Sequence, residues 1–148
     1  DSDLVARLLT QAETIAVAAP GAVERLGAPE RPEDLARFPC VLFGSSAASS
    51  LWRFTRDAET IEVEVAGPLT SNSLKLCLDA AVEGAGVASV PAFIARPALE
   101  TGALIRVLPD WTTGRVPLRI VYPSRRFVSA RLRAFIDETV ACFAEIEM

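Results

Sequence analysis

Short apolar segments of strand length alternate with helical patterns along the whole chain, and this alternation limits the possible folds. The apolar segments are 14–19, 40–43, 87–90, 104–108 and 118–122. They are mostly apolar on both faces, as in strands that are covered on both sides of a sheet. Helices are predicted at 20–26, 31–38, 73–83, 91–100 and 129–146. This order predicts an α/β fold.

One region departs from the alternation of strands and helices. Residues 51–55 and 60–65 are separated by the short segment 56–59, and apolar and acidic residues alternate in the second of them. Strict alternation is typical of a strand with one solvent-exposed face, so the two segments are predicted to form a hairpin. We therefore expect a mixed, mostly parallel sheet whose ligands bind beyond the carboxyl ends of its strands.

The composition argues against an enzyme, a metal site and a nucleic-acid surface. The net charge is −4, and a surface of this sign repels the phosphates of DNA. Histidine is absent from the sequence, so Ser-His-Asp and Cys-His catalytic arrangements are excluded within the chain. Cys40, Cys77 and Cys142 lie far apart among apolar neighbours, which favours buried free thiols over a disulfide framework or a metal site. We expect no catalysis, no cofactor and no metal.

Several conspicuous residues have a structural interpretation. Gly84 and Gly86 resemble the start of a dinucleotide fingerprint, but they follow a helix and precede a strand, so we predict a turn. Trp52 and Trp111 are interpreted as residues of the core or of an interface in preference to ligand-stacking residues. Arg133 is expected to pair with Asp137 on a solvated helix face. The inward residues predicted for the last helix are Leu132, Phe135, Ile136, Val140, Phe143 and Ile146.

Two polar segments lie where a strand ends and a new element begins. Residues 44–50 follow the strand 40–43 and include Ser45 and Ser46, and residues 70–73 place Asn72 and Ser73 at a helix start. Helix N-termini bind carboxylates through free N–H groups, and Ser and Asn side chains add donors. An ordinary loop explains the first segment and helix capping explains the second equally well, so both alternatives stay open.

Ordered phrases over nearly the whole chain resemble the co-inducer-binding domain of LysR-type transcriptional regulators. The phrases are AVAAPGAVERLGAPERPEDLARFPCVLF, LWRF, VEVAGPLTSNSLKLCLDAAVEGAGVASVPAFIARPALETGALIRVLPDW and LRIVYPSRRFVSARLRAFIDETV. The resemblance implies a fold like that of periplasmic solute-binding proteins, with two α/β lobes joined by crossing strands and a small effector in the cleft. It places the second lobe at 18–117 and parts of the first lobe at 1–17 and 118–148.

The resemblance also implies which residues and partners serve the effector. Ser45 and Ser46 match a loop that reaches the effector, Asn72 and Ser73 match a helix start that faces it, and Pro20 and Gly21 are weaker candidates. The expected effector is a small organic or aromatic acid.

The same resemblance sets expectations for assembly and location. We expect a homo-oligomer, either a dimer or a tetramer. We also expect an incomplete first lobe and DNA contact only through a winged helix-turn-helix domain outside this chain. No apolar stretch of about 20 residues is found, so we expect no membrane association and a cytoplasmic location. The alternative is a fragment of a periplasmic-type solute-binding receptor, against which the scattered cysteines argue.

Overall fold

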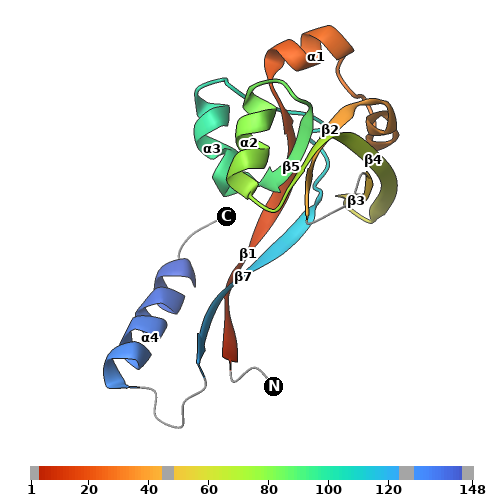
Figure 1. Cartoon of the computed structure of the whole chain (residues 1–148). Helices are drawn as coiled ribbons and strands as arrows, with labels where there is room; N and C mark the ends of the chain where they lie inside the picture. Colours follow the sequence, from red (N-terminus) through yellow and green to blue (C-terminus); the bar gives the residue numbers. More distant parts are fainter. Residues whose placement is uncertain (1–3, 45–48, 124–128, 145–148) are drawn as a thin grey trace. The chain divides into compact units, whose positions relative to one another are not determined.

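The computed structural model describes residues 4–44, 49–123 and 129–144 of the 148-residue chain. In chain order the elements are β1 (Leu4–Ala18), α1 (Pro20–Leu26), the 3-10 helix η1 (Pro32–Arg37), β2 (Pro39–Phe43), β3 (Ser49–Arg56), β4 (Glu59–Ser71), α2 (Leu74–Val82), β5 (Val87–Pro91), α3 (Ala92–Glu100), β6 (Ile105–Arg106), β7 (Gly114–Pro123) and α4 (Ala130–Ala144) (Figure 1). The predicted α/β alternation is confirmed.

The chain forms two compact units. One is Glu13–Gly114, and the other combines Asp1–Ala12 with Arg115–Met148. The chain passes from one unit to the other within β1 and again at the start of β7, and these two strands pair with each other.

The sheet has the order β3-β4-β2-β5-β1-β6, and β7 pairs with β1. β2 is parallel to both β4 and β5, whereas the pairs β1–β5, β1–β6 and β3–β4 are antiparallel. The mixed sheet and the predicted hairpin are therefore confirmed. Parallel pairing is confined to the central strands β4, β2 and β5, so fewer strand pairs are parallel than predicted. The others are antiparallel because β1 runs opposite to β5 and because β3 and β4 form a hairpin.

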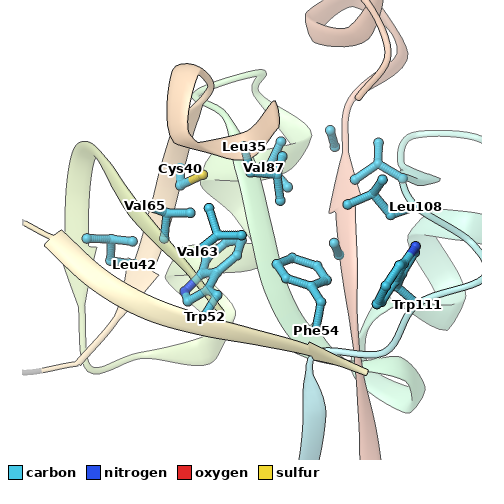
Figure 2. Close-up of a cluster of buried hydrophobic side chains, with 13 residues drawn as sticks. Leu35, Cys40, Leu42, Trp52, Phe54, Val63, Val65, Val87, Leu108 and Trp111 are labelled. Atoms are coloured by element: carbon cyan, nitrogen blue, oxygen red, sulfur yellow. The ribbon is translucent and has the colours of Figure 1, made fainter. Parts of the chain in front are cut away.

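Two apolar layers cover the two faces of the sheet in the unit Glu13–Gly114. On one face, the β3–β4 hairpin contributes Trp52 and Phe54 to an apolar cluster that also contains Trp111 and Leu108 (Figure 2). On the other face, the helices pack on the strands through small residues such as Ala22, Cys77, Ala81 and Ala95. Strand alternation explains the division, since Ala16 lies in the first layer and its neighbours Ile15 and Val17 in the second. Both tryptophans are buried, as predicted.

Two of the helix and strand predictions need local corrections, whereas the predicted glycine turn is confirmed. The segment predicted as a helix at 31–38 is the 3-10 helix η1. The strand predicted at 104–108 keeps only the two residues of β6, because Leu108 has a positive φ of 51° and its carbonyl accepts a turn hydrogen bond from the Trp111 N–H. Gly84 and Gly86, with φ of 80° and 155°, form the predicted turn between α2 and β5.

Helix α4 is less buried than its pattern predicts. Among its described residues Ile136 is buried, but Phe135 is 62% exposed and Cys142 is also exposed. Cys142 lies six residues after Ile136 and is therefore roughly 120° away around the helix. Asp137 pairs with Arg7 at 2.9 Å, so the expected pair with Arg133 is wrong.

Gly67 and Gly86 allow close approach of the central strands. A Cβ atom on Gly67 would overlap the carbonyl oxygen of Cys40, and one on Gly86 would overlap that of Pro39. Gly67 lies at an irregularity between β2 and β4, where Pro39 pairs with Ala66 but the next pair is Val41–Leu69. β2 therefore touches glycine backbone on both of its sides.

Replacement of Gly67 by Ala should destabilise the fold by about 1–3 kcal/mol, because the added methyl group meets rigid backbone. Gly21→Ala is the matched control, since a Cβ there has open space and α1 gains an alanine. The free energy of unfolding from urea titration checks both variants. Equal stability of the two would contradict the close approach.

The three thiols differ in burial. Cys40 and Cys77 are buried and Cys142 is exposed, so the prediction of buried free thiols holds for the first two only. Burial raises the pKa of the Cys40 thiol to about 12, and it also raises the pKa of Cys77. Because the thiolate is the reactive form, both buried thiols should resist alkylation near neutral pH.

Iodoacetamide at pH 8 should alkylate Cys142 in the native chain and leave Cys40 unmodified until urea unfolds it. Peptide mass spectrometry identifies the modified residue at each time. Alkylation of Cys40 at the same rate as Cys142 would show that Cys40 is not buried as described.

Candidate functional site

The carboxyl ends of β2 and β4 lie side by side. Leu42 is paired with Thr70 and Phe43 with Ser71, and the Gly44 N–H donates to the Ser71 carbonyl at 2.9 Å. The two predicted polar segments therefore leave the sheet at the same edge, which here means the side of the sheet where β2 and β4 end. Ser45 and Ser46 directly follow Gly44 and lie outside the described residues.

Asn72 and Ser73 differ in what their side chains do. The Ser73 hydroxyl caps α2 by accepting from the Leu76 N–H at 3.3 Å, and the Ser73 N–H donates to the Ser71 hydroxyl at 3.0 Å. The capping interpretation thus accounts for Ser73. Asn72 is exposed, and its side chain makes no hydrogen bond within the described part of the chain. Asn72 therefore offers a free polar side chain beside the start of α2.

Exposed apolar side chains accompany this edge. Phe43, the last residue of β2, is 53% exposed, and Leu76 in the first turn of α2 is 48% exposed. The residue paired with Phe43 is Ser71, one position before Asn72. The edge therefore combines polar donors with apolar surface, which suits a small molecule that has both a charged group and an apolar body.

Pro20 and Gly21 lie at the opposite edge of the sheet. β1 is antiparallel to β5, with Val17 opposite Ala88, so β1 ends where β5 begins. α1 starts there, at the far end of β1 from the chain start (Figure 1). β5 runs parallel to β2, and Asn72 lies just beyond the ends of β2 and β4. The structure therefore does not bring Pro20 and Gly21 together with Asn72 and Ser73.

The linings of two surface depressions include none of the described candidate residues. One of about 500 Å³ is lined by Leu26, Ala28, Glu30, Asp34, Arg37 and Phe38. Another of about 390 Å³ is lined by Glu30, Arg31, Pro32, Glu33, Arg56, Glu59, Ile61 and Trp111. The charged groups in them are largely used by the fold. The carboxylate of Asp34 accepts from the backbone N–H groups of Glu30 and Arg31, which lowers its pKa. Arg56 lies over the Trp111 ring and pairs with Glu59.

A hydroxyl pair that the sequence did not indicate joins Ser89 of β5 to Thr113, which directly precedes β7. The Ser89 and Thr113 hydroxyl oxygens are 2.6 Å apart, and the Thr113 N–H donates to the Thr14 carbonyl at 2.9 Å. Ser89 is a polar residue in an apolar strand, which is a weak signal in the sequence. Its pairing with Thr113 over 24 residues could not be predicted without the topology.

Neither a metal site nor a membrane span emerges from the residues that the structure describes. Within 4–44, 49–123 and 129–144 no three cysteine or carboxylate side chains gather as metal ligands. No described helix has the length and apolarity needed to cross a bilayer.

A family model described as the LysR substrate binding domain matches residues 1–142. This chain belongs to the LysR substrate-binding domain family. Among curated relatives, the transcriptional regulator PtxR of Pseudomonas aeruginosa is 34% identical over 93% of the chain. The probable regulator LtrA of Klebsiella pneumoniae is 32% identical over 78% of the chain. The chain spans 44% and 38% of these two proteins, less than half of each.

Solved LysR-type structures have the same fold. CrgA of Neisseria meningitidis superposes with a TM-score of 0.80 at 27% identity, over 98% of this chain and 49% of CrgA. The regulatory domain of AphB from Vibrio vulnificus gives 0.75 at 27% identity, over 95% of this chain and 71% of that domain. These matches confirm the predicted family and the periplasmic-binding-protein-like fold, and they favour a regulator domain over a solute receptor.

Proposed function

We propose that this LysR substrate-binding domain senses a small organic acid at the edge formed by the ends of β2 and β4 and the start of α2. The observation that supports this most is the position of Asn72, which is exposed, lies beside the start of α2 and directly follows Ser71, the strand partner of the exposed Phe43. A carboxylate is stabilised by the helix N-terminus and by amide donors, and an aromatic or aliphatic body by Phe43. We also propose Ser45 and Ser46, which follow Gly44 in the sequence, as contacts of the acid.

The proposal extends to the role of the two units. We assign Glu13–Gly114 to the second lobe, predicted at 18–117, and the remaining residues to the first lobe. The effector binds one conformation better than another and so shifts their populations, and no covalent bond is made or broken. The domain acts within a cytoplasmic homo-oligomer, a dimer or a tetramer, and a separate winged helix-turn-helix domain contacts DNA.

The proposed site predicts that a small acid stabilises the native chain. Benzoate, salicylate and succinate represent aromatic and aliphatic acids, and a ligand present at 100 times its Kd should add about 2.7 kcal/mol. This corresponds to a rise in Tm on the order of 5–10 °C. Differential scanning fluorimetry measures the shift. No shift with any of the three acids would contradict the proposal.

Asn72→Asp separates binding from folding. An added carboxylate near the start of α2 interacts favourably with the helix dipole, so the Tm without ligand should stay unchanged. The same carboxylate repels an anionic effector and should abolish the rise in Tm that the acid causes. Gly21→Asp adds the same charge at the start of α1, at the opposite edge, and should keep the shift. If Gly21→Asp abolished the shift and Asn72→Asp kept it, the site would be at the wrong edge.

A further inference from the structure

The buried thiol of Cys77 in α2 contacts both strands that end at the candidate site. Its side chain is only 1% exposed and packs in the apolar layer between the helices and the sheet. The sulfur lies 3.6 Å from the Leu42 carbonyl oxygen and 3.7 Å from that of Ser71. Leu42 is the penultimate residue of β2, and Ser71 is the last residue of β4. One thiol therefore joins α2 to the ends of β2 and β4.

Both residues that flank Asn72 are bonded to Cys77. The Ser71 carbonyl accepts from the thiol, and the Ser73 carbonyl accepts from the Cys77 backbone N–H at 3.0 Å. The backbone on either side of Asn72 is thus attached to the same residue of α2. Because Asn72 is exposed, these neighbours and not its own packing set its position.

The same thiol helps to fix the strand end that carries Phe43. The Leu42 carbonyl, just before Phe43, accepts from the thiol. The Gly44 N–H, just after Phe43, donates to the Ser71 carbonyl at 2.9 Å. The Ser71 carbonyl therefore accepts from the chain after β2 and also from α2. These bonds hold Phe43 and Asn72 in a defined arrangement.

The chemistry of the thiol suits a donor that stays in the core. A thiol carries one hydrogen, so it donates to one of the two carbonyls or is shared between them. Burial raises the pKa of Cys77, which keeps this hydrogen in place near neutral pH. Because its side chain is only 1% exposed, Cys77 acts through the residues that it holds and does not touch the acid.

We propose that Cys77 is a positioning residue that holds Asn72 and Phe43 in the arrangement that binds the acid. This inference rests on the proposed function. Without the thiol, the ends of β2 and β4 are less restrained against α2, so fewer molecules have the edge in its binding arrangement. The apparent Kd rises in proportion as this fraction falls.

Removal of the donor tests this role. With whichever of benzoate, salicylate and succinate binds most tightly, Cys77→Ala should raise Kd about 5- to 10-fold in isothermal titration calorimetry. Cys77→Ser leaves a similar gap in the core but keeps a donor, so its Kd should stay within about 3-fold of the original value. Cys77→Val lacks the donor but fills the space, so it should raise Kd even if Cys77→Ala does not fold.

Cys40→Ala is the matched control. Cys40 is also buried, and its thiol donates to the Phe38 carbonyl at 3.6 Å. Phe38 precedes β2, so this bond lies at the start of the strand and not at the edge where β2 ends. Cys40→Ala should lower the free energy of unfolding in a urea titration but leave Kd unchanged.

A urea titration of each Cys77 variant separates binding from folding. If Cys77→Ala or Cys77→Val lowers stability but binds the acid with unchanged Kd, the thiol is only structural and the inference is overturned. It is also overturned if Cys77→Ser binds as weakly as Cys77→Ala, or if Cys40→Ala raises Kd as much. If Asn72→Asp abolishes binding while the Cys77 variants bind normally, the inference fails and the proposed function stands. If none of the three acids binds, both fail.

Discussion

Parallel pairing of β2 with β4 on one side and β5 on the other is the constraint on which the candidate site depends. Gly67 and Gly86 permit it, since their missing side chains let the neighbouring backbone approach Cys40 and Pro39. Three strands that run in one direction end at one edge, and the segments that leave them meet there. The position of Asn72 beside the end of β2 follows from this pairing.

Much of this fold could be predicted from local sequence patterns. The apolar run 40–43, the alternation in 60–65 and the stripe on 73–83 each indicate one element, because burial and period act within a few residues. The predictions that were wrong concern features with nonlocal causes. Helix α4 carries a periodic apolar pattern, but Phe135 stays exposed among the described residues, and periodicity alone does not supply a packing partner. Leu108 adopts a positive φ that its neighbours in the sequence do not indicate.

The candidate site was predictable in part for the same reason. Asn72 and Ser73 follow a strand and begin a helix, and this local order was visible in the sequence. Pro20 and Gly21 show the same local order, but β1 runs antiparallel to β5, so they lie at the other edge. The Ser89–Thr113 pair depends on register between distant segments, which no local pattern encodes. Strand direction and register, more than residue type, thus decide which polar groups share an edge.

We propose that a small acid binds the unit Glu13–Gly114 at the edge where β2 and β4 end. The decisive measurement is a titration of benzoate, salicylate and succinate into the ¹⁵N-labelled chain, with the amide chemical shifts as the readout. We expect the largest changes on residues 43–44 and 70–74. Changes centred instead on the depression between Leu26 and Phe38, or on the start of α1, would contradict it.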